Sequence, residues 1–464
     1  MSLYDYMSSR FLACGSLLAL AETVNCIPDI LLFLRLIFLL NSAISALWWW
    51  ASCSPFVSRL FFVLSLPELF CTFPMQLFNS PLTDPPLVLV TGGAGFIGSN
   101  LSRILIAQGF TVRILDTLSP QVHGSVPEGL NWLNNSSIDF LRGSVTDKTD
   151  IERALAGVSA VVHLAAETGT GQSMYEISRY NFANSHGTAQ LLDILSSSKS
   201  HSVSRLVLAS SRSVYGEGAY TCSLCSEPSN RIFPLPRSAE QLASHCWNPI
   251  CSACGSELVA VPTLESDPVR PASVYAATKY AQEDLVRIVC QSIGIDHSIL
   301  RFQNVYGEGQ SLKNPYTGIL SIFSTRIRRG LDLPIFEDGL ESRDFVHVDD
   351  VARAIVAAIS SPSPVAGIIN IGSGIGTSVI DVAQELMTAL GIEVPLRVTG
   401  EYRIGDIRHN IADISRFCAL LPGGPQISLA EGLARFAAWV NTQPLPEDLL
   451  DSANNQLRER KLMA

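Results

Sequence analysis

The chain has 464 residues, enough for two or three domains, of which 47% are hydrophobic and 16% are charged. Its net charge is −10 and its 32 Lys and Arg residues are not clustered, which excludes the basic patch expected of a nucleic-acid-binding protein. Five of the 11 cysteines lie between Cys222 and Cys254, and this concentration requires an explanation of its own.

Residues 1–86 form a hydrophobic N-terminal extension that ends in a polar, proline-containing linker. The apolar run Ile30–Ala51 is long enough to span a bilayer, which would make it a membrane anchor followed by a cytosolic domain. A cleaved signal peptide ending near Ala21 is a second interpretation. We favour a third, in which the extension is dispensable and a start at Met75 gives a cytoplasmic protein.

The first motif of the folded region follows the linker. The apolar run Leu87–Val90 predicts a buried parallel strand, and Thr91-Gly92-Gly93-Ala94-Gly95-Phe96-Ile97-Gly98 predicts a tight turn that opens a helix. Free N–H groups at the start of such a helix bind an anion, and glycines let a pyrophosphate approach the backbone closely. A second strand over 110–115 ends at Asp116, whose carboxylate would bind a ribose diol and repel a 2′-phosphate. The pattern predicts NAD, bound by Gly92, Gly95, Phe96, Ile97, Gly98 and Asp116.

Strands and helices continue to alternate beyond this turn. Strands are predicted over 137–141, 159–166, 205–210 and 297–302, and helices from Lys148, over 174–197 and over 274–291. This alternation is typical of an α/β fold with a doubly wound parallel sheet covered by helices on both faces. Leu164, Ala165 and Ala166 end the fourth strand and are added to the expected NAD contacts, because small residues let a flat ring lie against the backbone.

The sequence is expected to divide into a dinucleotide-binding domain and a smaller lobe. Residues 87–304 form the first, with a cysteine-rich insert over 217–266, and 345–372 rejoin it through a helix over 348–360 and a strand over 368–371. Residues 305–344 and 373–441, punctuated by Gly and Pro, are expected to form the C-terminal lobe. The charged tail 442–464 is expected to be a surface appendage.

Tyr275 and Lys279 open the helix after the fifth strand, four residues apart and therefore on one helical face. Lowering the pKa of a tyrosine from about 10 to about 7 requires roughly 4 kcal/mol, which a cation about 4 Å away supplies at an effective dielectric near 20. With Lys279 and an oxidised nicotinamide as the cations, Tyr275 is expected to act as a general base near neutral pH. Ser211, at the end of the fifth strand, is expected to donate a hydrogen bond to the same substrate oxygen.

Five ordered motifs make the chain from Leu87 to about Val440 resemble the extended short-chain dehydrogenase/reductase superfamily. They are Thr91–Gly98, His163–Ala166, Ser210–Gly216, Tyr275-x-x-x-Lys279 and Arg343–Asp350. The resemblance implies a homodimer acting on a nucleotide sugar, with Ser211, Tyr275 and Lys279 catalytic and Asn304, Arg343 and Arg408 near the substrate. It also implies Ser144, Val145 and Asn184 near NAD, although Ser144 stands where the family often has an aspartate beside the adenine.

The residues after Ser211 help to separate the reactions of this superfamily. The 4,6-dehydratases carry an Asp-Glu pair there and the decarboxylases usually a Glu, whereas this chain has Arg212-Ser213. An epimerase remains: Tyr275 removes the C4 hydroxyl proton, the C4 hydride passes to NAD, and it returns to the other face of a 4-keto sugar. The chain is similar to the dTDP-L-rhamnose 4-epimerase type, through segments such as Gly171–Glu176, Gly405–His409 and the cysteine insert. Another epimerase, a dehydratase or a reductase of the superfamily, and a non-catalytic NAD-binding module, are the alternatives.

Two C-x-x-C pairs, Cys222 with Cys225 and Cys251 with Cys254, can supply four thiolates to one tetrahedral zinc ion. Unliganded thiols and disulfides are the competing interpretations, and disulfides are disfavoured in a reducing cytosol. We favour structural zinc, which would order an insert too short to form its own core. Because the insert lies between Ser211 and Tyr275, it is expected to flank the substrate site.

Overall fold

The computed structural model describes residues 86–464 except 126–128, 199–200, 226–229, 315, 317, 363–364 and 366. The described residues all belong to one compact unit, Thr83–Ala464. The predictions for the N-terminal extension, including the apolar run 30–51 and the start at Met75, lie outside the described residues. Within the described ranges, no helix is long and apolar enough to cross a membrane.

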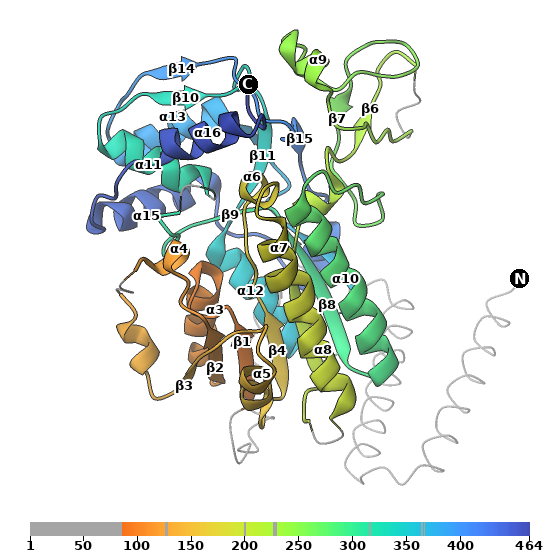
Figure 1. Ribbon diagram of the computed structural model, residues 1–464, viewed down its shortest axis with the longest axis vertical. Coiled ribbons are helices and arrows are strands. Elements are labelled where there is room, and N and C mark those ends of the chain that lie inside the picture. Colours follow the sequence, from red (N-terminus) through yellow and green to blue (C-terminus); the bar gives the residue numbers. More distant parts are fainter. Residues whose placement is uncertain are drawn as a thin grey trace, which may run out of the picture. The chain divides into compact units, whose positions relative to one another are not determined.

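The centre of the described unit is a seven-stranded sheet in the order β12-β8-β5-β4-β1-β2-β3 (Figure 1). Its strands are β1 (Leu87–Thr91), β2 (Thr111–Asp116), β3 (Ile138–Arg142), β4 (Ala160–His163), β5 (Arg205–Ser211), β8 (Asp296–Phe302) and β12 (Gly367–Ile371). Every neighbouring pair is parallel, with Val88 of β1 opposite Val112 of β2 and Ala160 of β4. The predicted doubly wound fold is confirmed, and its strand order reverses between β1 and β4, where such sheets bind ligands.

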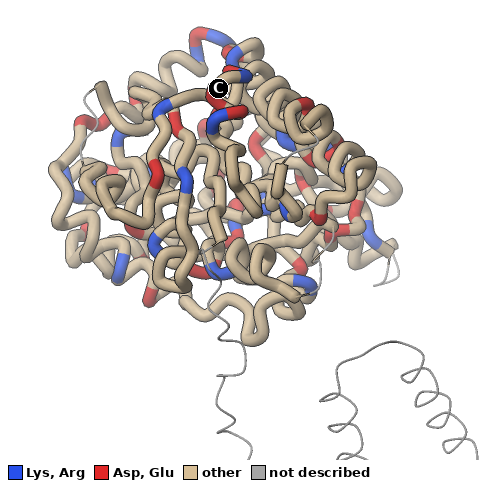
Figure 2. The backbone as a smooth tube through the Cα atoms, turned by 90° about the horizontal axis from the view of Figure 1, so that it is seen from below, with Lys and Arg blue, Asp and Glu red and all other residues tan. Residues whose placement is uncertain are grey.

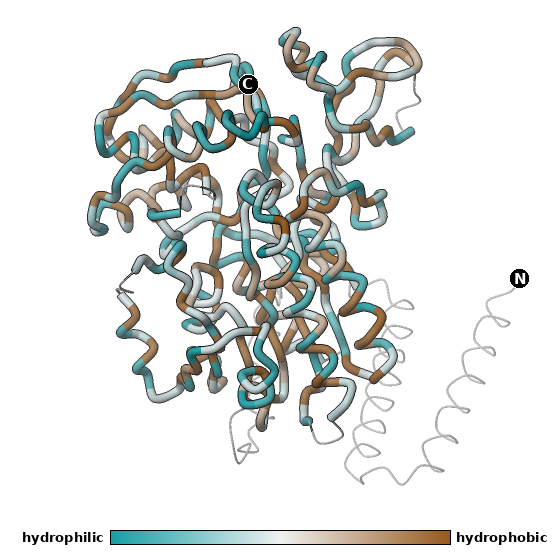
Figure 3. Tube along the Cα trace, in the orientation of Figure 1, coloured by the Kyte–Doolittle hydropathy of each residue, from teal (hydrophilic) through white to brown (hydrophobic). Residues whose placement is uncertain are grey.

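Helices cover both faces of the sheet because alternate strand residues point to opposite sides. Val88 and Val90 belong to one core, whereas Leu89 belongs to the other. The helices on the first face are α3 (Phe96–Ala107), α12 (Val348–Ser360) and α14 (Ser415–Leu420), and those on the second are α5 (Lys148–Leu155), α8 (Gly187–Ser197) and α10 (Val274–Ile293). Hydrophobic and hydrophilic positions alternate along these helices, as expected of helices with one buried face (Figure 3).

The predicted helix over 174–197 is the clearest local departure from expectation. The short helix α6 (Thr170–Ser173) precedes it, α7 (Ile177–Tyr180) begins it, and the π-helical segment η2 (Asn181–His186) separates α7 from α8. Another short helix, α4 (Pro120–His123), lies between β2 and β3. Single π-helical turns inserted in α-helices are frequent at functional sites, and this one changes the side-chain phase along the helix.

A C-terminal lobe has its own core and two small sheets, and lies above the central sheet in Figure 1. Strands β9 (Asn304–Tyr306), β11 (Ser342–His347), β13 (Gly376–Ser378) and β15 (His409–Asn410) form one sheet, and β10 (Leu333–Ile335) pairs with β14 (Leu396–Val398). The helices of this lobe are α11 (Ile319–Arg328), α13 (Val379–Leu390), α15 (Leu429–Thr442) and α16 (Leu450–Glu459). The prediction that the tail is a surface appendage is therefore wrong for α16, because its Leu450, Ala453 and Leu457 side chains are buried.

The cysteine-rich insert forms a small separate layer of structure. Its strands β6 (Tyr220–Thr221) and β7 (Val259–Ala260) pair antiparallel, and α9 (Ala239–Ala243) lies between them in sequence. Tyr220, Cys222, Cys251 and Leu258 make its core. Basic and acidic residues are interspersed along the described backbone (Figure 2).

Candidate active site

The glycine-rich turn joins β1 to α3 and leaves the start of that helix open. A Cβ atom on Gly92, whose φ is +67°, would lie 2.8 Å from the backbone nitrogen of Ala165, and one on Gly98 would lie 2.5 Å from the Cα of Gly93. Side chains are therefore excluded where the turn passes β4 and where the helix packs on the strand. This is the cradle that a dinucleotide pyrophosphate requires.

A cavity of about 680 Å³ begins at this turn, and we call it the cofactor cavity. The predicted NAD contacts that line it are Gly92, Gly95, Phe96, Ile97, Gly98, Asp116, Ser144, Val145, Leu164, Ala165, Ala166, Tyr275 and Lys279. They come from the carboxyl ends of several parallel strands, which meet at one edge of the sheet. The structure thus brings together every predicted NAD residue except Asn184.

Asp116 has a second task besides lining the cofactor cavity. Its Oδ2 accepts a hydrogen bond from the Ala94 N–H at 3.1 Å, and its Oδ1 accepts one from the Leu118 N–H at 2.8 Å. The side chain therefore holds the glycine-rich turn against the end of β2. A ligand hydroxyl that binds this carboxylate would meet an oxygen pair already fixed in position.

The predicted NAD contact of Asn184 is not supported, because this residue is fully buried away from the cavity wall. It lies in η2, where its Oδ1 accepts from the Glu167 N–H at 2.8 Å and its Nδ2 donates to the Glu167 carbonyl at 3.1 Å and to Thr278 Oγ1 at 3.0 Å. Asn184 therefore fixes the chain that follows β4. The sequence predicts a regular helix here, and the π-helical segment points the side chain elsewhere.

Tyr275 and Lys279 lie at the first turns of α10, beside the end of β5 where Ser211 is found. The Ser273 hydroxyl caps the helix by accepting the Ala276 N–H, and the Tyr275 N–H donates to Ser173 Oγ at 3.0 Å. Lys279 Nζ donates to the Ala209 carbonyl at 2.8 Å. These contacts fix Tyr275 and Lys279 in the wall of the cofactor cavity, whereas Ser211, which hydrogen-bonds to Tyr275, is not among the residues that line either cavity.

Burial is the largest influence on the pKa values of Tyr275 and Lys279. It lowers the pKa of Lys279 to about 8, although the charge of Glu283 acts in the opposite direction. It raises the pKa of Tyr275 above the ordinary value, although a hydrogen bond with Ser211 and the charge of Arg212 lower it. The expected depression of the Tyr275 pKa is therefore not found in the chain by itself, and it requires the positive charge that NAD⁺ adds when bound.

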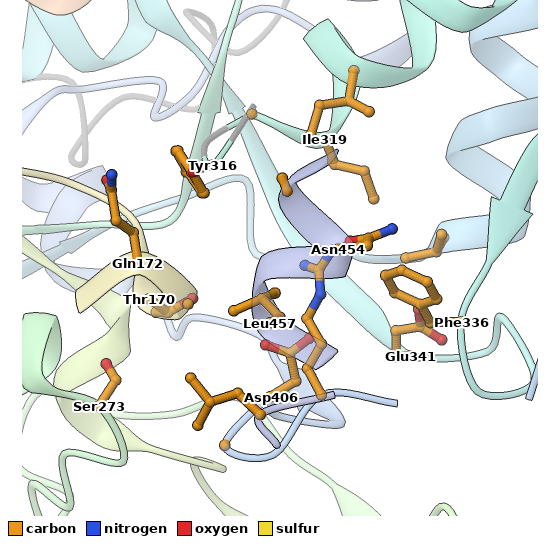
Figure 4. A pocket seen from close by; sticks show the side chains of 18 of the residues that line it. Thr170, Gln172, Ser273, Tyr316, Ile319, Phe336, Glu341, Asp406, Asn454 and Leu457 are labelled. Carbon is orange, nitrogen blue, oxygen red and sulfur yellow. The ribbon is translucent and has the colours of Figure 1, made fainter. Parts of the chain in front are cut away.

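A second cavity of about 260 Å³ adjoins the first, since Asn304, Gly318 and Ile319 line both; we call it the lobe cavity (Figure 4). Arg212 and Arg343 also line it. The Arg212 Nε donates to Asn304 Oδ1 at 2.7 Å, and burial together with the charge of Arg343 lowers the pKa of Arg212 to about 9. Two neighbouring guanidinium groups repel each other, and an anionic ligand bound between them would offset this repulsion.

The predicted substrate residue Arg408 lies elsewhere. It is buried with 1% of its surface exposed and is absent from the walls of both cavities. Its guanidinium donates to both carboxylate oxygens of Asp338, at 2.7 and 2.8 Å, and to Glu337 at 3.0 Å. A fourth donor, Nε, is used by Asn248 Oδ1 at 2.9 Å, so four of the five N–H groups already have partners within the protein. The structure therefore does not support the predicted substrate contact.

Sequence reasoning missed Arg212 and the α16 helix as parts of the lobe cavity. Arg212 directly follows the predicted catalytic Ser211. In the sequence it shows only that the acidic residues of the dehydratases are missing at this point, and it does not show that the side chain lines a cavity. In α16, Leu450, Ala453 and Leu457 recur at helical spacing, which signals an amphipathic helix. That signal is available in the sequence, although it does not identify the surface that the helix covers.

The four predicted metal ligands converge in the insert. The sulfur atoms of Cys222, Cys225, Cys251 and Cys254 all lie within 4.8 Å of one another, with three pairs at 3.4 to 3.5 Å. Tetrahedral zinc with Zn–S bonds of about 2.3 Å requires sulfur atoms about 3.8 Å apart. The cluster therefore has the right size for one ion, and its four cysteines form no disulfide.

Comparison with known proteins decides the family. The family model described as the NAD dependent epimerase/dehydratase family matches residues 88–237 and 241–372. The chain belongs to this family. The dTDP-L-rhamnose 4-epimerase of Burkholderia thailandensis is 38% identical over 366 residues, which cover 78% of this chain and 97% of the relative. The predicted superfamily, and the prediction of an enzyme of nucleotide-sugar epimerase type, are confirmed.

Solved structures agree with this membership. The UDP-glucose 4-epimerase of Thermotoga maritima, solved with UDP-glucose, has a TM-score of 0.60 at 28% identity and covers 76% of this chain and 98% of that one. The UDP-glucose 4-epimerase of Thermus thermophilus, solved with NAD, has a TM-score of 0.59 at 26% identity and covers 77% and 100%. Similar folds of this kind therefore bind NAD and nucleotide sugars.

Proposed function

We propose that the chain catalyses the NAD-dependent 4-epimerisation of a nucleotide sugar of the dTDP-L-rhamnose type through a 4-keto intermediate. The observation that carries this proposal is the position of Tyr275 and Lys279 in the cofactor cavity, which shares Asn304 with the lobe cavity. A sugar held where the two cavities meet would reach the phenol and the cofactor together. The 38% identity to the rhamnose-type relative supports this sugar over others.

The residues of the cofactor cavity fit NAD. The open start of α3 and the space kept free at Gly92 and Gly98 would hold the pyrophosphate, and the fixed carboxylate of Asp116 would hold a ribose. When bound, NAD⁺ supplies an acceptor for the hydride at C4 of the sugar and returns that hydride in each cycle. The carboxylate disfavours the 2′-phosphate of NADP by like charge.

The chain's own residues would move the proton. Tyr275 would take it from the C4 hydroxyl at its phenolate oxygen, and would return it after the sugar has turned over. Ser211 would donate a hydrogen bond to the same oxygen, and the ammonium group of Lys279 would stabilise the phenolate. Arg212 and Ser213 offer no acid after Ser211, which favours an epimerase over a dehydratase.

The lobe cavity would bind the nucleotide part of the substrate. Arg343 and Arg212 would face its pyrophosphate, and Asn304 lies where the two cavities meet. Arg343 is held in place by donating to the carbonyl oxygens of Ile407 and Arg408, at 2.8 and 3.0 Å. We assign Arg408 a bracing role in place of substrate contact.

Proton NMR of the full chain incubated with dTDP-L-rhamnose, without added cofactor, tests the function. We expect the C4 configuration to equilibrate, because NAD that is regenerated in each cycle stays with the protein. Conversion of UDP-glucose or another nucleotide sugar alone would overturn the choice of sugar. A folded, NAD-loaded protein that epimerises none of them would overturn the reaction.

We also propose that the four insert cysteines bind one structural zinc ion. The insert contacts the lobe through Arg237, which donates to the Asp406 carbonyl at 2.9 Å and to Glu337 at 2.8 Å. Because Asp406 lines the lobe cavity, ordering of the insert by zinc would support that wall. The metal's role would be structural, since four thiolates leave it no open position.

Elemental analysis should find one zinc ion per chain, and Cys251→Ser should remove it and lower the melting temperature. The control is Cys246→Ser, because Cys246 lies in the same insert but outside the cluster. It should keep both the zinc and the stability. Zinc-free wild-type protein with unchanged melting behaviour would favour unliganded thiols.

A homodimer in the cytoplasm is proposed from the family resemblance alone. Light scattering of the purified full chain measures the assembly, and cell fractionation measures the location. Recovery with membranes would favour the anchor interpretation of residues 1–86.

A further inference from the structure

The segment after α15 forms a wall of the lobe cavity. Leu450, Ala453, Asn454 and Leu457 of α16 line this cavity, as does Leu462 beyond the helix. In Figure 4 the side chains of Asn454 and Leu457 lie among the residues that surround it. The part of the chain that looked like a charged tail therefore reaches the site proposed for the substrate.

Backbone pairing holds this segment in place at its end. The Tyr402 N–H donates to the Ala464 carbonyl at 2.8 Å, the Ala464 N–H donates back to Tyr402 at 3.1 Å, and the Ile404 N–H donates to Leu462 at 3.0 Å. The partner strand, residues 402–404, belongs to the loop whose Arg403 and Ile404 line the same cavity. The end of the chain and this loop thus form one continuous wall.

Side chains hold the helix from the opposite direction. Gln456 Oε1 accepts hydrogen bonds from the hydroxyls of Tyr316, at 3.0 Å, and Tyr175, at 3.3 Å. The Arg460 guanidinium lies 4.3 Å from the centre of the Tyr175 ring. The helix therefore connects the lobe with the segment between β4 and α8 that also lines the cavity, and its cavity face is fixed in position.

Asn454 has the features of a ligand-binding side chain. It is 3% exposed, and its Oδ1 accepts from Arg403 Nη2 at 3.0 Å. Among the described residues its Nδ2 has no hydrogen-bond acceptor, and it is not one of the fully buried unpaired atoms, so this donor keeps accessible surface on a residue that lines the cavity. Glu341, which lines the same cavity, has a buried Oε2 that accepts no hydrogen bond from the described residues and has only a long ion pair with Arg408, at 3.8 Å.

The surroundings of Asn454 indicate which part of a substrate it meets. Arg403, which donates to Asn454, also lies with its guanidinium 4.7 Å from the centre of the Phe336 ring, and Glu341 lines the same cavity. In the view of Figure 4, Ser273, two residues before Tyr275, lies on the other side of the cavity from Phe336. An aromatic ring with an amide donor and a carboxylate acceptor nearby suits a planar heterocycle that carries both carbonyl and N–H groups. A pyrimidine base has both.

We propose that the C-terminal segment 450–464 is part of the substrate site, with Asn454 binding the nucleoside end of a pyrimidine nucleotide sugar and Leu457 packing against it. This inference rests on the proposed function, because it assigns the lobe cavity to the nucleotide. It makes α16 a determinant of nucleotide affinity.

Titration calorimetry of dTDP and UDP on the NAD-loaded full chain tests this. Asn454→Ala should weaken binding of the preferred nucleotide about tenfold, the value of one hydrogen bond to a buried group. Leu457→Trp should block binding, because the larger side chain fills the cavity. The matched control is Asn455→Ala, on the exposed face of the same helix, which should bind as the wild type does.

Kinetics separates recognition from mere support of the fold. Asn454→Ala should raise KM for the nucleotide sugar with little change in kcat, in NAD content or in melting temperature. Variants of Asn454 and Leu457 that bind dTDP and UDP as the wild type does would overturn the inference while leaving the epimerase intact. A wild type that binds nucleotide without epimerising any sugar would overturn the function alone, and a wild type that binds neither nucleotide would overturn the inference.

Discussion

Replacement of Tyr275 by Phe is expected to lower kcat by about 10² to 10⁴, the range by which a positioned acid or base accelerates a reaction. The variant keeps the ring that lines the cofactor cavity and loses only the oxygen that exchanges the C4 proton. Ser211 would still reach the substrate oxygen, but a serine hydroxyl without a base is a poor proton acceptor at neutral pH. NAD content should stay at the wild-type level, because the glycine cradle and Asp116 are unchanged.

The matched control is Tyr280→Phe on the same helix, since Tyr280 is 37% exposed and faces away from the site. Its rate should equal that of the wild type. The rate is measured by NMR of the C4 proton, and the bound NAD by its absorbance after denaturation of the protein. A Tyr275→Phe variant that epimerises at the wild-type rate would remove Tyr275 from the mechanism.

The sequence predicts the cofactor cavity well for a physical reason. Each motif is local, a strand end or a helix start, and in a doubly wound sheet the carboxyl ends of the strands meet at one edge. Residues as distant in sequence as Gly92, Ala165 and Lys279 therefore come together once the strand order is known. The same regularity predicts that α12 and β12 return to the sheet between the two segments of the lobe.

Arg408 and α16 could not be predicted in the same way. Arg408 sits in a motif that resembles the substrate arginines of the family, but Asp338 and Glu337, from a distant loop, occupy its donors. The amphipathic spacing of α16 predicts a buried face without identifying the cavity that it covers. Both depend on which distant segments meet, and this information is carried by tertiary packing.

Glu283 is expected to be among the residues of α10 on which stability depends most. It is 3% exposed, and it accepts from Arg301 Nη2 at 2.6 Å, from Arg301 Nε at 2.9 Å, and from Ser210 Oγ. Glu283→Ala would leave the 1% exposed Arg301 charged and unpaired in the core. The free energy of unfolding should fall by about 3 to 5 kcal/mol, the cost of breaking a buried ion pair from one side.

Urea unfolding measures this loss, and the neighbouring residue supplies the control. Asp284 forms a solvent-exposed ion pair with Arg287, so Asp284→Ala should lower the free energy of unfolding by less than about 1 kcal/mol. The double variant Glu283→Leu with Arg301→Met should recover part of the loss, since it removes both charges. Equal losses for Glu283→Ala and Asp284→Ala would show that the buried pair has no special weight.

The same carboxylate also connects stability to catalysis through Lys279. Burial lowers the pKa of Lys279 to about 8, and the Glu283 charge prevents a further fall. Glu283→Gln keeps the shape and removes the charge, so Lys279 should lose its proton at a lower pH. Since the ammonium form stabilises the Tyr275 phenolate, the alkaline fall of kcat/KM should move to lower pH in this variant. An unmoved alkaline limb, in a variant with wild-type NAD content, would mean that Lys279 does not set it.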